Sequence, residues 1–211
     1  MKVIVIGTGG LAREFCGFFS KEIEIVGFSS TEKVEFERYS LPGKFFGSEI
    51  SPESVGTKYA ALTVGNPHLK RSISAKLKNL GFTFPNLVHS SVVTASNIHK
   101  DSSEGVIISP SCVIGSNVVF ANHVYINFMV GIGHDASFGS FVQVNPGAQI
   151  GGVVSIGESV LIGSGSTVRQ GLKVKQASTV GSGSVVLSSV RESTTVVGNP
   201  AKRLKLPNFD G

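Results

Sequence analysis

Hydrophobic residues follow two different periods along the chain, and the change between them divides the sequence near residue 88. In the first half, continuous apolar runs that are typical of buried parallel strands alternate with stretches of helical spacing. This pattern predicts strands over residues 2–6, 22–28, 60–64 and 82–88, and helices over residues 11–20 and 68–80. We therefore expect a small βαβ domain over residues 1–88 and a second domain over residues 89–211.

The second half repeats every six residues. From Ile108 to Val186, fourteen hydrophobic residues occur at intervals of six without a gap, and the residue four places after each is small or apolar. Such a period fits neither a helix nor a hairpin sheet. It indicates coils that stack because none can bury its apolar face alone, and so predicts a β-helical prism. Before Ile108 we expect Val92 and Ile98 to keep the spacing, followed by a four-residue insertion.

Composition excludes several classes of protein. Only 16% of the residues are charged, 26 are glycine, and the mean hydropathy is +0.23, which excludes intrinsic disorder and a coiled coil. We expect no membrane span, because no apolar stretch approaches about 18 residues. Two cysteines provide neither a disulfide framework nor a metal site, so we expect no metal and a cytoplasmic location. A net charge of +5 is too mild for nucleic-acid binding.

Charge is unevenly distributed along the second half. No lysine or arginine occurs between Gly105 and Val168, whereas seven follow: Arg169, Lys173, Lys175, Arg191, Lys202, Arg203 and Lys205. This basic end either keeps the chain in solution or binds a phosphorylated ligand.

Five sequence motifs resemble one enzyme family, the bacterial sugar acetyltransferases that join a Rossmann-like domain to a left-handed β-helix of hexapeptide repeats. The motifs span nearly the whole chain: Val3-Ile4-Val5-Ile6-Gly7-Thr8-Gly9-Gly10, Val64-Gly65-Asn66, Ile132-Gly133-His134-Asp135, Asn145-Pro146-Gly147-Ala148 and Val197-Gly198-Asn199-Pro200-Ala201-Lys202. The resemblance implies an α/β Rossmann-like domain that binds a sugar nucleotide, followed by an all-β left-handed parallel β-helix. It also implies an acetyl-CoA-dependent homotrimer that N-acetylates a nucleotide-linked amino sugar in surface glycan biosynthesis.

His134 is the candidate base for such a transfer. The amine must lose a proton when it attacks a thioester, and a histidine has a pKa near neutrality that suits this task. Asp135 would orient the imidazole and stabilise its cation, provided that a turn lets the two adjacent side chains meet.

The acetyl donor is expected along a corner of the prism. The segment from Ile162 to Ser166 recurs eighteen residues later, and the two copies would stack into a wall nearly free of side chains. We interpret it as a track for acetyl-CoA past Ser164 and Ser182, although tight turns alone also favour glycine. The resemblance adds Gly152, whose backbone region would hold the oxyanion. It also adds Gln143, which stands where the family often has a histidine that touches the donor.

The acceptor is expected at the glycine loop of the first half. Gly7-x-Gly9-x-x-Ala12 follows a strand and opens a helix, a context that suits a pyrophosphate. An NAD site would usually carry an acid after the second strand, where this chain has Ser29-Ser30, so redox chemistry is disfavoured. By family position, the substrate residues are Gly9, Gly10, Leu11, Ser29, Ser30, Gly65 and Asn127. Asn127 would stack with Asn145 and could instead only satisfy amides of its turn.

Two alternatives to N-acetylation remain open: O-acetylation of sialic acid or another sugar, and a β-helix that binds without catalysis. A homotrimer is also favoured by Tyr125, Phe128 and Met129, which an isolated prism would expose near the predicted active turn.

Overall fold

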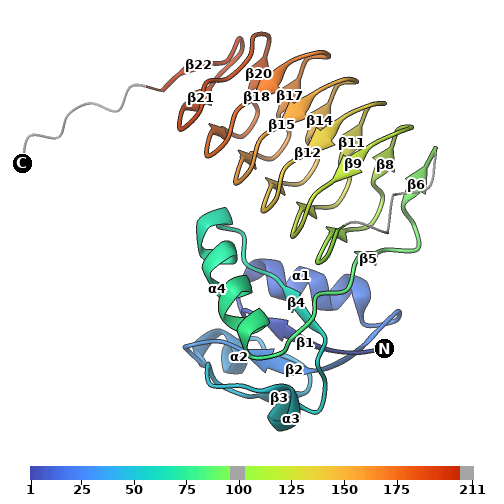
Figure 1. The fold of residues 1–211 in the computed structure, drawn as a ribbon, viewed down its shortest axis with the longest axis vertical. Coiled ribbons are helices and arrows are strands. Elements are labelled where there is room, and N and C mark those ends of the chain that lie inside the picture. Colours follow the sequence, from blue (N-terminus) through green and yellow to red (C-terminus); the bar gives the residue numbers. More distant parts are fainter. Residues whose placement is uncertain (96–102, 205–211) are drawn as a thin grey trace, which may run out of the picture.

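The structure is a computed structural model that describes residues 1–95 and 103–204. An α/β unit at the N-terminus is followed by a three-sided prism of short parallel strands that rises from it (Figure 1). The predicted Ile98 and Lys205 lie outside the described residues.

The N-terminal unit is a four-stranded parallel sheet in the order β3-β2-β1-β4. Its strands are β1 (Lys2–Ile6), β2 (Glu24–Ser29), β3 (Lys44–Phe45) and β4 (Ala60–Leu62). Its helices are α1 (Gly10–Phe19), α2 (Val34–Arg38), α3 (Pro52–Val55) and α4 (Pro67–Asn79). Alternate residues of β1 pack on α1 and on α3 and α4, which is why this strand is a continuous apolar run.

The predicted elements of this unit are confirmed except one. The sequence pattern missed α2, β3 and α3, which are too short to show a period. The strand over residues 82–88 is confirmed only in part: Thr83 forms an isolated parallel bridge with Tyr59 beside β4, whereas Leu87–Val88 forms the strand β5, which pairs with the prism.

The prism has three faces, each a sheet whose strands are parallel except for β22 (Figure 1). The eight-stranded face contains β5, β7 (Ile107–Ile108), β10 (Tyr125–Ile126), β13 (Gln143–Val144), β16 (Leu161–Ile162), β19 (Thr179–Val180), β21 (Thr195–Val197) and β22 (Lys202–Arg203), the last antiparallel. The six-stranded face contains β6 (Val93–Thr94), β8 (Val113–Ile114), β11 (Gly131–Ile132), β14 (Gln149–Ile150), β17 (Thr167–Val168) and β20 (Val185–Val186). The four-stranded face contains β9 (Val119–Phe120), β12 (Ser137–Phe138), β15 (Ser155–Ile156) and β18 (Lys173–Val174).

The six-residue repeat is the period of this prism. All fourteen repeat positions from Ile108 to Val186 are buried in one core, together with the small residues four places on. Paired strands are offset by eighteen residues, as in Ile126↔Val144. The first coil differs from the prediction, because Val88 and Thr94 pair with Ile108 and Ile114 at an offset of twenty, and Val92 takes a corner position against the core.

Three corners join the faces, and we number them in chain order. The first corner follows the eight-stranded face (109–112, 127–130, 145–148, 163–166 and 181–184). The second corner follows the six-stranded face (115–118, 133–136, 151–154, 169–172 and 187–190). The third corner follows the four-stranded face (121–124, 139–142, 157–160 and 175–178).

The N-terminal unit packs on the lower eight-stranded face and the third corner. Ile107 and Tyr125 share a core with α1. Helix α4 runs along the third corner and contacts several coils of the prism through polar side chains. Arg71 pairs with Glu158, Ser74 with His123 at 2.7 Å, and Lys78 with Glu104 at 2.5 Å.

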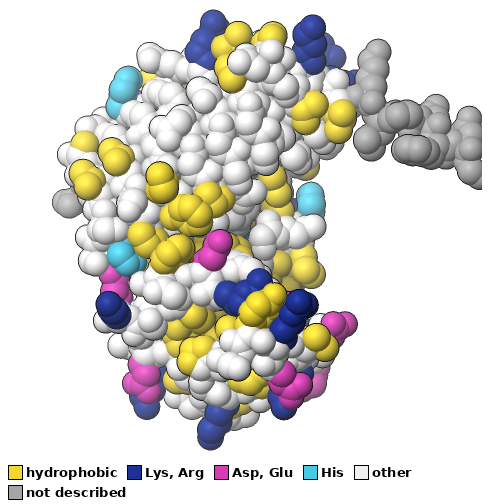
Figure 2. Space-filling model, turned by 180° about the vertical axis from the view of Figure 1, so that it is seen from behind, with side chains coloured by type: hydrophobic (Ala, Val, Ile, Leu, Met, Phe, Trp, Pro, Cys, Tyr) yellow, Lys and Arg dark blue, Asp and Glu magenta, His cyan; other side chains and the backbone are white. Residues whose placement is uncertain are grey.

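Charged side chains gather on the N-terminal unit and at the far end of the prism, with a surface nearly free of charge between them (Figure 2). Among the described residues, no helix is long and apolar enough to cross a membrane.

Candidate active site

The carboxyl ends of β1, β2 and β4 bring the glycine loop and Gly65 to one edge of the N-terminal sheet. Gly9 caps α1, Gly10 and Leu11 begin it, and Gly65 precedes α4. A Cβ added at Gly9 or Gly65 would meet no atom within 4 Å, so this edge is open at both positions. Because β1 lies between β2 and β4, the edge is a topological switch point, where parallel sheets bind ligands.

Ser29 and Ser30 lie at the same edge, where β2 ends. Ser29 is buried and donates its hydroxyl hydrogen to Gly47 O at 2.7 Å, which leaves its oxygen only as an acceptor. Ser30 is half-buried. Neither offers the carboxylate that a ribose-binding NAD site uses.

His134 and Asp135 meet at the second corner, as the turn argument requires. The left-handed backbone of Asp135, with φ of 57°, brings the adjacent side chains together. His134 Nδ1–H donates to Asp135 Oδ2 at 2.7 Å, and Asn117 Nδ2 donates to Asp135 Oδ1 at 3.0 Å. These hydrogen bonds, that from His134 first, lower the pKa of Asp135. The carboxylate therefore holds one ring nitrogen and leaves Nε2 as the acceptor.

Gly152 lies on the next coil, directly against this imidazole. A Cβ at residue 152 would stand 2.7 Å from His134 Nε2, closer than real contacts allow. Glycine is therefore required here to leave Nε2 open. The neighbouring Val153 N–H already donates to His134 O at 2.7 Å.

The two glycine–serine segments stack at the first corner, as predicted. Gly163 N donates to Val180 O at 2.7 Å, and Gly183 N to Ser164 O at 2.8 Å. A Cβ at Gly163 would lie 2.4 Å from Ser182 N, so the close coil spacing requires glycine. Ser164 and Ser182 are exposed, and they are the side chains that line the outside of this wall.

Asn127 takes the second of its two expected roles, and Gln143 lies in an enclosed environment. Asn127 is buried, and its Oδ1 accepts from Phe128 N at 2.8 Å, so its side chain satisfies its own turn rather than lining the edge of the sheet. Gln143 is 1% exposed, and its amide contacts Lys70 and Asn145. This enclosed environment does not suit the direct donor contact that the resemblance suggested.

Sequence reasoning missed Lys70 and His123. Lys70, in the first turns of α4, is 1% exposed and donates from Nζ to Gln143 Oε1 at 3.0 Å. Burial lowers its pKa to about 7. His123 is also buried, against Ser74, and burial lowers its pKa to about 4. Lys70 looks like a solvated helix residue and His123 lies outside the buried repeat positions, so the burial of both is a property of the packing between the two units.

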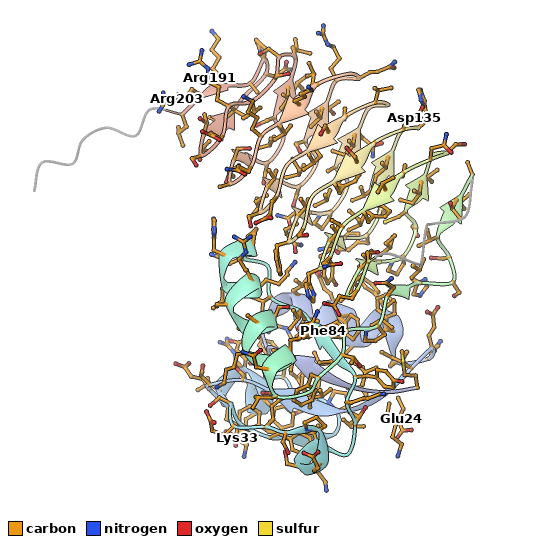
Figure 3. The ribbon with its side chains drawn as sticks, in the orientation of Figure 1. Glu24, Lys33, Phe84, Asp135, Arg191 and Arg203 are labelled. Atoms are coloured by element: carbon orange, nitrogen blue, oxygen red, sulfur yellow. The ribbon has the colours of Figure 1, made fainter. Side chains whose placement is uncertain are left out.

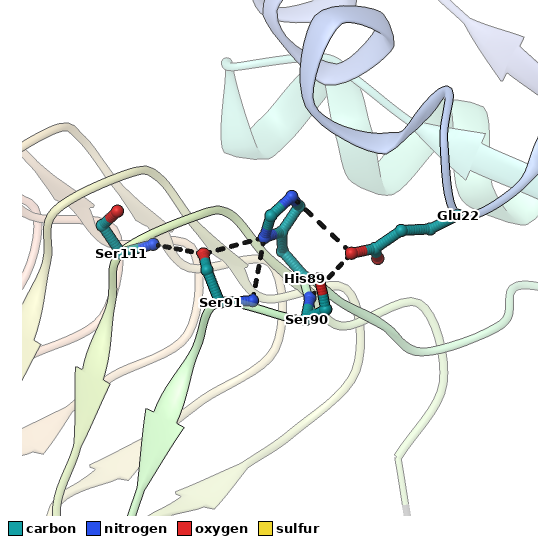
Figure 4. A network of polar contacts seen from close by, with 5 residues as sticks. All are labelled: Glu22, His89, Ser90, Ser91 and Ser111. Atoms are coloured by element: carbon teal, nitrogen blue, oxygen red, sulfur yellow. Dashed lines mark hydrogen bonds and ion pairs between the residues drawn. The ribbon is translucent and has the colours of Figure 1, made fainter.

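A second polar network joins Glu22, in the turn between α1 and β2, to the first coil (Figure 4). His89 Nδ1 is 2.8 Å from Ser91 Oγ, and His89 Nε2 is 3.6 Å from Glu22 Oε1. Ser91 Oγ also accepts from Ser111 N at 3.0 Å. These contacts connect the first coil of the prism to the N-terminal unit. His68, by contrast, is exposed on α4.

The basic end surrounds a cavity of about 400 Å³ that is lined by Arg191, Lys202 and Arg203 among others. Figure 3 shows Arg191 and Arg203 together at the far end of the prism. Strand β22 follows Gly198, whose carbonyl accepts from Val185 N, so this end continues the stack of the first corner.

The predicted site residues therefore form three groups that one chain does not bring together. They lie at the sheet edge, at the second corner with His134, and at the first corner with Ser164 and Ser182. Figure 3 shows Asp135 on the side of the prism remote from the N-terminal unit. Among residues 1–95 and 103–204, no three His, Cys, Asp or Glu side chains gather as a metal site.

Apolar exposure on the prism differs from the prediction. Tyr125 is 1% exposed beneath the N-terminal unit, and Phe128 packs on Phe18 with ring centroids 5.8 Å apart. Met129 is 61% exposed, as predicted. The other exposed apolar side chains of the charge-poor segment are Val113, Val119 and Val153, at 56%, 49% and 51%.

No protein-family model and no curated protein sequence matches the chain. Solved structures do match over nearly its whole length. The acetyltransferase domain of PglB from Neisseria gonorrhoeae is 28% identical, with a TM-score of 0.81 over 96% of this chain and 99% of that one.

PerB from Caulobacter crescentus, solved with CoA and GDP-perosamine, is 23% identical, with a TM-score of 0.84 over 97% of this chain and 98% of that one. WeeI from Acinetobacter baumannii is 22% identical, with a TM-score of 0.77 over 97% of this chain and all of that one. The likeness to PerB and WeeI supports the fold alone, and this fold fits the predicted left-handed β-helix of acetyltransferases.

Proposed function

We propose that this protein transfers an acetyl group from acetyl-CoA to the amine of a nucleotide-linked amino sugar. The observation that carries the proposal is the His134–Asp135 pair, with Nδ1 held at 2.7 Å and Nε2 open beside Gly152. The PglB domain, solved also with acetyl coenzyme A at 28% identity, supports the donor, and PerB with GDP-perosamine supports the class of acceptor.

His134 is the general base of this reaction. As the amine nitrogen attacks the thioester carbonyl, Nε2 takes the amine proton, and Asp135 stabilises the imidazolium that forms. The Gly152 N–H, which donates to no backbone carbonyl among the described residues, holds the oxyanion. Collapse of the tetrahedral intermediate breaks the C–S bond, and the departing thiolate takes the proton from His134. The products are the acetamido sugar and CoA.

Acetyl-CoA lies along the first corner. The wall of stacked glycines and serines offers backbone groups and no bulky side chain, which suits a long, thin pantetheine arm. Its charged nucleotide end points to the basic residues Arg191, Lys202 and Arg203, which neutralise phosphate. The thioester end then lies toward the coil of Asn145, next to the N-terminal unit.

The sugar nucleotide binds the open edge of residues 1–88, which we propose as a Rossmann-like domain. The unpaired amides at the start of α1 and the small residues Gly9, Gly10 and Gly65 admit a pyrophosphate. Leu11, Ser29 and Ser30 line the rim, with Ser29 Oγ as an acceptor. Residues 89–211 form the acetyltransferase domain. Strand β5, which precedes this boundary, already belongs to the eight-stranded face of the prism.

The active site is shared between subunits of a homotrimer. The second corner of one prism must meet the first corner and sheet edge of another, because one chain holds these groups apart. Four apolar side chains of the prism are 49–61% exposed: Val113, Val119, Met129 and Val153. A closed ring of subunits would cover such side chains on every subunit. The cytoplasmic location stays a prediction.

Thiol release tests the function. The purified protein is mixed with acetyl-CoA and, in turn, UDP-, dTDP- and GDP-linked amino sugars, and free CoA thiol is followed. We expect release that depends on one class of amino sugar. Release with sialic acid or a neutral sugar instead would favour O-acetylation, and binding of CoA without any release would favour a non-catalytic β-helix.

A further inference from the structure

A buried hydrogen-bond chain runs from α4 to the first corner. Lys70 Nζ donates to Gln143 Oε1 at 3.0 Å, and Gln143 Nε2 donates to Asn145 Oδ1 at 3.3 Å. Lys70 and Gln143 are each 1% exposed, whereas Asn145 is half-buried. The chain therefore starts in the packed junction between the two units and ends at the surface of the prism.

The direction of this chain is fixed at its buried end. The Lys70 ammonium can only donate, so Gln143 turns its carbonyl oxygen toward Lys70. Its NH₂ group then faces Asn145, which must present Oδ1 in return. Neither Nδ2 hydrogen of Asn145 has a hydrogen-bond partner among the described residues, and the residue is half-buried, so this donor is left for a ligand.

Asn145 lies where the two proposed ligands would meet. Its N–H donates to Ile162 O, and Gly165 N donates to the neighbouring Pro146 O, both at 2.9 Å, so it stands directly below the glycine–serine wall. Lys70, at the other end of the chain, follows the Gly65–Asn66 loop by one helical turn and contacts the Tyr125 ring, with Nζ 5.5 Å from its centroid.

We propose that Lys70 is a positioning residue, which acts through Gln143 to orient Asn145 so that its Nδ2 donates a hydrogen bond to the carbonyl oxygen of the acyl donor. This inference rests on the proposed function, since it needs an acyl thioester at the first corner. It also explains a glutamine at position 143: its amide has both the acceptor that Lys70 needs and the donor that Asn145 needs.

The alternative is that Lys70 only holds the two units together. The two roles predict different effects of substitutions on kcat. Gln143→Glu keeps an acceptor for Lys70, and even gains an ion pair, but loses the donor to Asn145. Lys70→Met keeps the length of the side chain and removes the donor. Asn145→Asp replaces the Nδ2 donor with an acceptor. Ser74→Ala is the matched control, because it removes another contact of α4 with the prism, that to His123.

We expect kcat to fall about 10-fold in Lys70→Met and Gln143→Glu and about 100-fold in Asn145→Asp, as for a lost oxyanion donor. KM for the sugar nucleotide should stay within about twofold, because its binding edge is untouched. Ser74→Ala should lower Tm and leave kcat unchanged. Wild-type kcat in both Gln143→Glu and Asn145→Asp would overturn the proposal, whether or not Lys70→Met folds.

Calorimetry separates this inference from the proposed function. The wild type should bind acetyl-CoA several-fold more tightly than CoA, because only the thioester offers the carbonyl, and Asn145→Asp should lose that difference. A wild type that shows this preference but acetylates no amino sugar would refute the proposed function alone. Equal affinities for both ligands in wild type and variant would refute the role of Asn145 alone.

Discussion

Replacing Gly152 by alanine tests the placement of the catalytic base without touching the base itself. The added methyl would lie 2.7 Å from His134 Nε2 and 2.9 Å from its two neighbouring ring carbons, where ordinary contact begins at 3.4 Å. The imidazole must therefore move by about 0.7 Å, and a misplacement of about 1 Å can cost about 100-fold in rate. We expect kcat to fall by about 10- to 100-fold, measured by CoA thiol release at saturating substrates.

The fold should tolerate this change, because the His134 side chain is 56% exposed and can swing toward solvent. Gly17→Ala is the matched control: residue 17 is exposed on α1, and its Cβ would meet no atom within 4 Å. The control should keep full activity and gain slightly in stability from better helix propensity. If Gly152→Ala also keeps wild-type kcat while remaining folded, then His134 does not act from this position.

Four further outcomes are expected. His134→Ala should lower kcat by about 100-fold or more with an unchanged circular dichroism spectrum, since positioned proton transfer contributes about 10²–10⁴-fold; wild-type turnover would exclude it as the base. Phe at Ser164 or Ser182 should abolish CoA binding in calorimetry but leave sugar-nucleotide binding intact. Unchanged CoA affinity would show that the donor does not bind along the first corner. Mixed oligomers of His134→Ala and Ser182→Phe should regain part of the activity, whereas a fully active monomer in light scattering would refute the shared site. Burial lowers the pKa of His123 to about 4 and of Lys70 to about 7, below their ordinary values of 6.5 and 10.5. Between the lowered and the ordinary pKa of each group the unfolded chain binds more protons than the folded protein, so stability rises with pH there. The rise of the urea midpoint from pH 7 to pH 9 should therefore be smaller in Lys70→Met.

The hexapeptide period was sufficient to predict the prism, because each repeat position buries one side chain in a common core. The same regularity placed the two glycine–serine segments above each other, eighteen residues apart. His134 and Asp135 could be paired from sequence only as neighbours, and the left-handed turn at Asp135 is what joins them.

Contacts between the two units could not be predicted in the same way. Lys70 looks like one more solvated lysine of an amphipathic helix, and Gln143 like an exposed strand residue. Each is buried only because α4 lies along the third corner while the N-terminal unit covers the lower eight-stranded face. Tyr125 was expected at the surface for the same reason. The strand predicted over residues 82–88 is divided, because Thr83 pairs with Tyr59 while β5 pairs across this junction.

The chemical identity of the product tests the central claim most directly. Acetyl-CoA labelled with ¹³C at the acetyl carbonyl is incubated with the amino-sugar nucleotide that supports thiol release, using wild type and His134→Ala, and the product is examined by NMR. We predict that the wild type moves the label into an amide on the sugar nitrogen, in equal amount to the CoA released, and that the variant leaves it in the thioester. A label found in an ester, or an amide formed equally fast by the variant, would contradict the account.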